Sequence, residues 1–231
     1  MKEFKKLVFV LLLLAACNIC YAQDISIRGG LNFSQFNYKT GSDVIHKEGT
    51  KLNPGFNFGT VLDLPIKSIF SLEAGILFES KGHKLEGNPL MGVENYLFQT
   101  NIFYLDIPIS FKVTVPINKT KIIAMAGAYT GSALYGNRLA KGVENSVLKS
   151  YKASIKWGNE SNEYDRFDYG LTFGTGIKIQ RYQIGASYEL GLKDFSNDRV
   201  FEMRNRVFEF YLAYTLKELK KVKNEDQTPK K

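Results

Sequence analysis

The amino-acid sequence predicts an all-β protein, an eight-stranded antiparallel up-and-down transmembrane β-barrel with short periplasmic turns and long extracellular loops. Apolar and polar residues alternate with a period of two in eight segments, as they do in strands whose two faces meet different surroundings. The connections between these segments are alternately long and short. The mean hydropathy of the 231 residues is only −0.19, which fits barrel strands because their alternation averages to a neutral value.

The first 22 residues have the features of a signal peptide. Three lysines precede an apolar stretch over residues 7–16, and a short polar segment then ends at Cys20-Tyr21-Ala22, with small residues at the positions that a signal peptidase reads. Cleavage there would leave Gln23 first and remove both cysteines of the sequence. A mature chain without cysteine has neither a disulfide nor a thiolate metal ligand.

A second processing signal overlaps the first. The residues Leu14-Ala15-Ala16-Cys17 resemble a lipobox, which would place the cleavage before Cys17 and attach a lipid to it. The six residues from Cys17 to Ala22 favour ordinary cleavage and leave lipidation of Cys17 as the alternative. The sequence thus predicts three parts: a signal peptide over 1–22, an outer-membrane β-barrel over 23–216 and a basic periplasmic tail over 217–231.

Each of the eight segments sets an apolar face against a polar or glycine-rich one. The fifth is rich in Ala and Gly, so its facing is ambiguous. In chain order, 25–33 sets Ile, Leu and Phe against Ser, Arg, Gly and Asn; 55–64 sets Phe, Thr and Leu against Gly, Asn, Val and Asp; 70–79 sets Phe, Leu, Ala and Ile against Ser, Glu, Gly and Leu; 103–113 sets Phe, Leu, Ile and Val against Tyr, Asp, Pro, Ser and Lys; 122–134 is the ambiguous one; 168–179 sets Tyr, Leu, Phe, Thr and Ile against Asp, Gly, Thr and Lys; 182–193 sets Tyr, Ile, Ala and Leu against Gln, Gly, Ser, Glu and Lys; and 207–216 sets Phe, Leu and Tyr against Val, Glu, Tyr, Ala and Thr.

The lengths of the connections indicate how the strands are arranged. In an up-and-down barrel, every second connection lies at the same end, so alternating lengths give one end of long loops and one of tight turns. Outer-membrane barrels have this anatomy, with their turns toward the periplasm. The long connections are 35–52, 80–100, 135–166 and 195–204, and the short ones are 65–68, 116–119 and 180–181.

Polarity indicates which face points into the barrel. Small residues and charges of both signs suit the narrow lumen of an eight-stranded barrel, and the opposite faces carry mainly Leu, Ile, Phe, Val and Tyr, as contact with lipid requires. A lipocalin-like secreted barrel, with its apolar face turned inward around a small ligand, is the alternative. The charges expected in the lumen are Arg28, Asp63, Glu73, Glu79, Asp106, Lys112, Asp168, Lys178, Glu189, Lys193 and Glu209.

Several short motifs add a resemblance to a known family. They are Tyr104-Leu105-Asp106-Ile107-Pro108-Ile109, Arg28-Gly29-Gly30-Leu31-Asn32-Phe33, Asp168-Tyr169-Gly170 and Asn205-Arg206-Val207-Phe208, together with a signal that ends Tyr-Ala-Gln. In these motifs the chain resembles the PorT-like outer-membrane β-barrel family of Bacteroidetes over essentially the whole mature sequence. The resemblance implies an eight-stranded barrel in the bacterial outer membrane, and one class of its members takes part in protein secretion.

No motif in the sequence predicts catalysis, a cofactor or a metal site. The two histidines, His46 and His83, are expected in surface loops. Glu79, Ser80 and His83 could suggest a hydrolase, but neighbouring strand residues point to opposite faces, so Glu79 and Ser80 do not converge on one histidine. We therefore expect a non-enzymatic structural or interaction scaffold.

The expected partners follow from location and charge. A membrane barrel contacts outer-membrane lipid, and an exported protein without a basic aromatic patch does not meet nucleic acid. Envelope or secretion proteins are expected to bind either loop 135–166, which mixes lysines with Trp157 and Tyr164, or the Lys-rich tail. Charges in the lumen are expected to pair with one another and to leave no channel.

Overall fold

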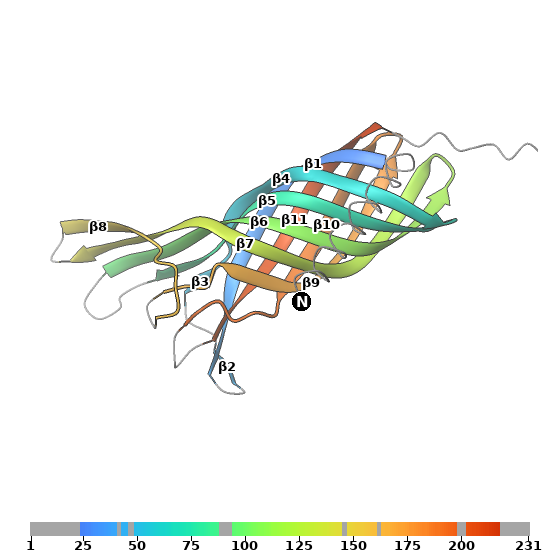
Figure 1. Cartoon of the computed structure of the whole chain (residues 1–231). Helices are drawn as coiled ribbons and strands as arrows, with labels where there is room; N and C mark the ends of the chain where they lie inside the picture. The colour runs from blue at the N-terminus through green and yellow to red at the C-terminus, as the bar shows by residue number, and fades with distance from the viewer. Residues whose placement is uncertain are drawn as a thin grey trace, which may run out of the picture.

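The computed structural model describes residues 24–40, 43–45, 49–87, 94–144, 147–160, 163–197 and 202–217, so the predicted signal peptide and the tail beyond residue 217 lie outside the described residues. No helix in this part of the chain is long and apolar enough to cross a membrane. Eight strands pair side by side, all antiparallel, and the last pairs with the first, so that they close into a ring (Figure 1). In ring order they are β1 (Asp24–Thr40), β4 (Asn53–Lys67), β5 (Phe70–Gly87), β6 (Glu94–Ile117), β7 (Thr120–Glu144), β9 (Phe167–Ile179), β10 (Tyr182–Gly191) and β11 (Glu202–Lys217).

Each of the eight predicted segments corresponds to one ring strand, although residues 192–193 of the seventh lie beyond the end of β10. Within the ring strands, the seven faces that were predicted point as expected. In β9, Leu171 and Phe173 are exposed on the outer wall, whereas Thr172 between them is buried in the lumen. The facing of the ambiguous fifth segment is also clear, because Ile123 and Met125 of β7 are buried. Alternation between two environments therefore decides the register of the wall.

Three connections are two-residue turns at one end of the ring, which we call the turn end. They join β4 to β5, β6 to β7 and β9 to β10. The first residue of each turn, Ser68, Asn118 or Gln180, has a positive φ of 49°, 55° or 52°. Such φ values are typical of tight hairpin turns because their twist matches that of the flanking strands. The predicted short turns are thus confirmed.

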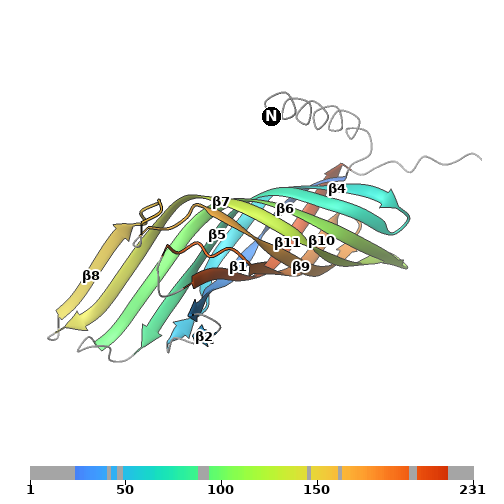
Figure 2. The ribbon, with the colours of Figure 1, turned by 60° about the horizontal axis from the view of Figure 1, so that its bottom comes forward.

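At the opposite end, the loop end, the connections between ring strands are longer than the turns, as predicted, but strand pairing continues into much of the ranges expected as loop. Strands β5, β6 and β7 continue far beyond the ring, so most of residues 80–100 is strand, and 135–166 begins with the end of β7 and a further strand, β8 (Val147–Ser154), that pairs with it. Two short strands, β2 (Asp43–Ile45) and β3 (Thr50–Lys51), pair with β1 and β5. Figure 2 shows the extended strands side by side. This extension lies outside the bilayer, so its two faces meet similar surroundings. The two-residue alternation that marks the ring strands is therefore weak there.

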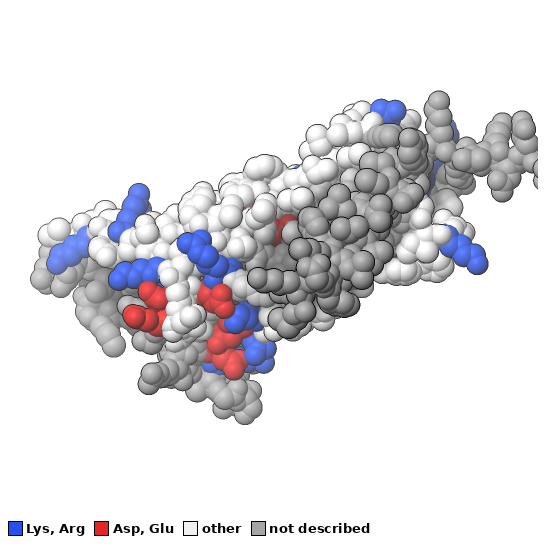
Figure 3. Space-filling model, in the orientation of Figure 1, with Lys and Arg blue, Asp and Glu red and all other residues white. Residues whose placement is uncertain are grey.

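The outer wall is apolar between two bands of aromatic rings. Phe103 stacks on Tyr135 at 4.3 Å and on Phe78 at 5.9 Å near the loop end, and Phe70 stacks on Phe111 at 5.5 Å near the turn end. Both β5 and β6 place nine residues from one band to the other, which agrees with the ~9–11 residues of a transmembrane strand. In Figure 3 the charged side chains gather mainly at the loop end.

This exterior also decides against the lipocalin-like alternative. Large apolar side chains such as Leu31, Ile76, Ile109, Ile184 and Leu212 are each more than half exposed on the wall. A soluble barrel would turn such a face inward, because a continuous apolar surface of this extent is unfavourable in water. The apolar face lies outside, where lipid covers it.

Candidate functional site

The polar faces of the ring strands meet in the lumen, where charged side chains form three layers of ion pairs. In the layer nearest the turn end, the Lys112 ammonium of β6 lies 2.7 Å from Asp63 of β4 and 2.8 Å from Glu73 of β5. Lys178 of β9 lies 3.4 Å from Asp24 of β1. These contacts join five strands across the interior.

Arg28 of β1 forms the middle layer. Its guanidinium lies 3.1 Å from Glu209 and 3.7 Å from Glu73, and its carbon centre stacks 3.6 Å above the ring of Tyr211. Arg28 also donates a hydrogen bond to the Ser187 hydroxyl, which in turn donates to Glu209 at 2.6 Å. The buried guanidinium thus has the ionic and hydrogen-bonding partners that burial of a charge requires.

The third layer centres on Lys81 of β5, whose side chain is fully buried. Its ammonium lies 2.5 Å from Asp106 and 2.6 Å from Glu189, and 4.2 Å from the centre of the Tyr129 ring. A third carboxylate, Glu79, lies 3.7 Å away. One lysine therefore holds carboxylates from three strands together.

This layer has the spacing of a metal site but already holds a cation of its own. Ligand oxygens of Glu79, Asp106 and Glu189 lie within 4.8 Å of one another. The Lys81 ammonium makes short contacts with two of these carboxylates, as a bound metal ion would. The three acids therefore act as partners of Lys81, and we do not assign them a metal.

The side chains leave little free space between these layers. A cavity of about 10 Å³ lies beside Arg28, Thr172 and Glu209, which is the room of one water molecule at most. At Gly131 on β7, an added Cβ would lie 1.8 Å from Asp106 Oδ1, so only glycine lets the acid approach this wall. In the part of the chain that is described, the lumen is filled rather than open.

An apolar cluster caps the lumen at the loop end. Residues 155–160, 163–166 and 192–197 fold across the mouth, where Phe195 is fully buried and stacks edge-on against Phe36 at 5.0 Å and Tyr164 at 5.3 Å. Two arginines contact the aromatic rings of the cap, because Arg138 of β7 lies over Tyr164 and Arg166 lies over Trp157. The cluster comprises Phe36, Tyr38, Ile102, Tyr104, Ala133, Ile155, Tyr164 and Phe195, with Trp157 and Met203 packed against it.

An ion pair joins the two segments of this cap. The Lys193 ammonium lies 3.0 Å from Asp165. Partial burial raises the pKa of Asp165, but a hydrogen bond from the Phe167 amide and the contact with Lys193 outweigh it, so the pKa lies below its ordinary value. The carboxylate therefore stays ionised and holds the cap across neutral and mildly acidic pH.

Of the eleven charges predicted for the lumen, ten lie along it and one does not. Lys193 follows the end of β10 and belongs to the cap, because the ring ends before it. Sequence reasoning missed Lys81, which lies in a stretch predicted as loop. Its signal was available, since the inward positions Glu79, Lys81 and His83 continue the alternation of β5.

His83 is another correction, because it is buried beneath the cap and not in a surface loop. It stacks on Phe36 at 5.4 Å and packs against Tyr38 at 5.3 Å. Glu79 and His83 face the interior of the barrel, whereas the alternation turns Ser80 to the opposite face, so the three do not form a catalytic arrangement. His46 lies outside the described residues.

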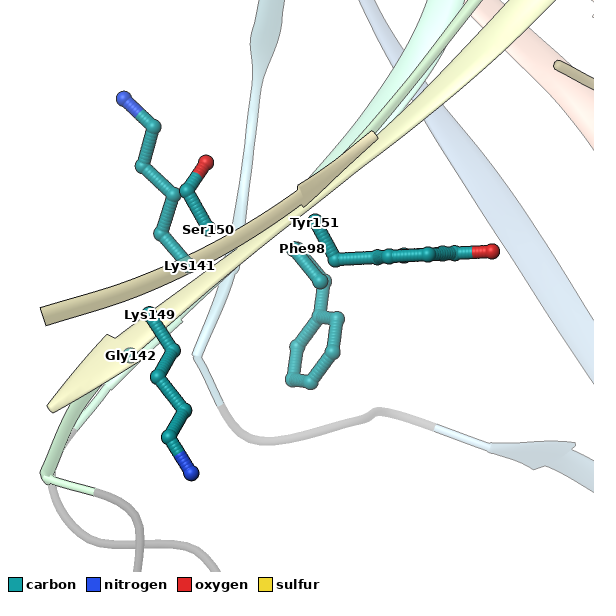
Figure 4. A pocket seen from close by; sticks show the side chains of 7 residues that line it. Phe98, Lys141, Gly142, Lys149, Ser150 and Tyr151 are labelled. Carbon is teal, nitrogen blue, oxygen red and sulfur yellow. The ribbon is translucent and has the colours of Figure 1, made fainter. Parts of the chain in front are cut away.

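The remaining accessible feature is the sheet of β5, β6, β7 and β8 that extends beyond the ring, which we call the projecting sheet. Phe98, Ala140 and Tyr151 lie opposite one another on adjacent strands and form one row on its inner face. Two hollows of about 560 and 360 Å³ adjoin this row. In Figure 4 the Phe98 and Tyr151 rings lie side by side, and Lys141 and Ser150 point to the other side of the ribbon.

A closed ring of eight antiparallel strands, apolar outside and filled with ion pairs inside, defines an outer-membrane β-barrel. The family described as outer membrane protein beta-barrel domain matches residues 21–197, and the chain belongs to this family. The protein is therefore a protein of the bacterial outer membrane. The narrower assignments to PorT-like proteins and to Bacteroidetes stay predictions.

Two solved structures are similar to the chain over most of its length. One is Ail, the attachment invasion locus protein of Yersinia pestis, in complex with the heparin analogue sucrose octasulfate, with 15% identity, a TM-score of 0.37 and coverage of 84% of this chain and 98% of Ail. The other is Neisserial surface protein A, with 11% identity, a TM-score of 0.40 and coverage of 83% and 96%. No curated protein matches the sequence.

Proposed function

We propose that the protein is a non-enzymatic outer-membrane scaffold that holds the projecting sheet outside the bilayer for other envelope proteins to bind. The observation that carries this proposal is the contrast between a lumen filled with ion pairs and a sheet that extends beyond it. With about nine residues past the aromatic band on β5, and a rise of about 3.3 Å per residue, the sheet reaches on the order of 30 Å. A role in protein secretion would use this surface.

The orientation and processing of the chain are part of this proposal. The loop end faces the cell exterior and the two-residue turns face the periplasm, as in other barrels of this class. Cleavage after Ala22 would leave Gln23 at the start, and residues 217–231 would form a basic periplasmic tail. Intact-mass analysis should find a chain that begins at Gln23; incorporation of a labelled fatty acid that is lost in Cys17→Ser would show a lipoprotein instead.

Shortening the β7–β8 hairpin tests the function. Arg138 and Ala153 lie opposite each other on the two strands, and the alternation from the Ile155–Gly136 hydrogen bond makes them a hydrogen-bonded pair. Replacing residues 139–152 with Asn-Gly therefore closes the hairpin early, without disturbing the ring or removing Arg138 from Tyr164. We expect a barrel that still shows heat-modifiable migration on gels but loses its co-purifying envelope proteins after cross-linking in cells. Deletion of residues 218–231 is the matched control. Loss of partners in the control alone would transfer the role to the tail, and an unchanged set in both would contradict the proposal.

A further inference from the structure

The outer edge of β8 is the one edge of the projecting sheet that ends without a described neighbour. Strand β8 pairs with β7 and with no other described strand. Its eight residues are almost entirely exposed, including Val147 at 58%, Leu148 at 69% and Tyr151 at 70%. A long exposed edge with apolar side chains readily pairs with another strand, and proteins usually cover or blunt such edges.

The backbone of β8 shows which of its groups are available at this edge. The Ile155 amide donates to the Gly136 carbonyl at 3.0 Å, directly after the last residue of β8. Because N–H and C=O groups of a strand alternate in direction, those of Tyr151 and Ala153 also point toward β7. Those of Leu148, Ser150 and Lys152 therefore point outward and can form a new ladder.

The charge of β8 indicates what kind of strand fits. The strand carries Lys149 and Lys152 and no acidic residue. In a new antiparallel ladder, outward residues face outward residues, so pairing with a second copy of β8 is centred on Ser150 or Tyr151. The first register brings Lys149 diagonal to the Lys149 of the copy, and the second does the same for Lys152. Neighbouring like charges on one face are unfavourable, whereas an acidic strand would pair favourably with both lysines. The lysines thus disfavour self-association and favour an acidic partner.

We propose that β8 binds an extended acidic segment of another protein, which adds to the projecting sheet as a further strand. This proposal rests on the interaction role above and specifies its partner. Backbone hydrogen bonds to Leu148, Ser150 and Lys152 hold the segment, and its acidic side chains pair with the lysines on the two faces. The neighbouring row of Phe98 and Tyr151 is positioned to contact apolar side chains of the same segment.

Binding of synthetic peptides to the purified barrel tests the proposal. The probe is an eight-residue peptide of valine, threonine and glutamate with a fluorophore, measured by anisotropy with the barrel in an uncharged detergent. The comparison peptide has lysine in place of glutamate, and a third is N-methylated at alternate amides so that it cannot form a ladder. We expect the acidic peptide to bind at least tenfold more tightly than either of the others. Equal binding of the N-methylated peptide would overturn the strand addition.

Variants of one outward residue provide the second half of the test. Ser150→Pro removes an outward N–H and keeps the inward ladder to β7, because proline is tolerated on the solvent side of an edge strand. Ser150→Ala keeps this N–H and is the matched control. We expect at least tenfold weaker binding for Ser150→Pro and native binding for Ser150→Ala. The double variant Lys149→Glu/Lys152→Glu should bind the basic peptide in preference to the acidic one.

The outcomes separate this proposal from the more general interaction role. If Ser150→Pro binds like the native barrel while the charge reversal abolishes binding, the lysines bind a polyanion by charge alone, and strand addition is wrong. If no peptide binds but the shortened hairpin still loses its envelope partners, the acidic-strand proposal fails and the scaffold function stands. If the shortened hairpin keeps every partner, the scaffold function fails.

Discussion

Adjacent residues of the barrel wall meet lipid on one side and a crowded polar lumen on the other. Leu171 and Thr172 of β9 are neighbours in the chain, yet one side chain is exposed on the wall and the other is buried. The effect of a substitution on stability therefore depends first on whether the residue faces lipid or the lumen, and only then on the chemistry of the new side chain. The same holds in the lumen, where charges such as Arg28, Lys112 and Lys81 depend on partners from other strands.

Arginine substitutions at these two neighbours test the facing. Leu171→Arg would place a charge in hydrocarbon, and we expect it to lower the free energy of unfolding by about 2–4 kcal/mol near the midplane. Thr172→Arg puts the same side chain into the lumen beside Glu189, its cross-strand partner, where crowding and not hydrocarbon sets the cost. Urea titration in lipid vesicles measures both. An equal effect of the two substitutions would contradict the assigned faces.

Removal of Lys81 tests the ion-pair network. Lys81→Met leaves Asp106 and Glu189 buried without their cation, and loss of one member of a buried pair costs about 3–5 kcal/mol. We expect a loss of this order in the free energy of unfolding. Adding Glu79→Gln, Asp106→Asn and Glu189→Gln should restore most of it, because the uncompensated charges are then gone. A quadruple variant as unstable as Lys81→Met would contradict the role given to the lysine charge.

The two ends of the barrel are built differently. At the turn end, three two-residue turns fix the register of strand pairs with a positive φ at their first residue. At the loop end, β5, β6 and β7 continue beyond the aromatic band and β8 pairs with β7. The pairing of β6 with β7 shifts its register between Phe103 and Tyr104 as it enters the projecting sheet. The two ends of the barrel therefore differ, with tight turns at one and extended strands at the other.

Glycine substitutions in two turns test how much strain they store. The left-handed conformation costs residues with a side chain about 1–2 kcal/mol, and a glycine at that position removes this cost. Part of the stability gained is lost again, because glycine has greater backbone entropy in the unfolded chain. We expect Gln180→Gly to raise the free energy of unfolding by roughly 0.5–1 kcal/mol. Asn118→Gly is the control and should gain less, because asparagine tolerates this conformation. Thermal unfolding of the two variants in the same detergent gives the comparison, and a larger gain at Asn118 would contradict the argument.

At the scale of the whole molecule, the closed ring, the filled lumen and the cap make a wall without a passage. Three layers of ion pairs occupy the interior, and Phe195 with its aromatic neighbours covers the mouth. The molecule therefore presents two large surfaces, its lipid-facing wall and the projecting sheet. The wall anchors the protein in the membrane, and we propose that the projecting sheet binds partners.

Planar-bilayer recording tests this closure. We expect the purified barrel to show no steady conductance, because ion pairs fill the lumen of the described ring and the cap covers its mouth. Removing residues 155–160 from the cap is a useful comparison, since the ion pairs below should keep the lumen closed without it. Stable open-channel currents from the native protein would overturn the description of the lumen as filled.

The sequence by itself determined the number of ring strands, the facing of seven of them and the places of the short turns, because in a membrane wall each residue meets one of two solvents and this leaves a period of two in the chain. The paired lumen charges were predictable for the same reason, as Arg28 and Glu209 illustrate.

Only the tertiary structure decided what lies beyond the bilayer. Lys81 and His83 were assigned to a loop, and β8 was not foreseen, since strands that leave the membrane lose the contrast between their two faces. Their order comes from hydrogen bonds to neighbouring strands and from contacts between residues far apart in the chain, such as Phe36 with Phe195. Long-range pairing of this kind leaves no local pattern, and so the partner surface became visible only in the folded molecule.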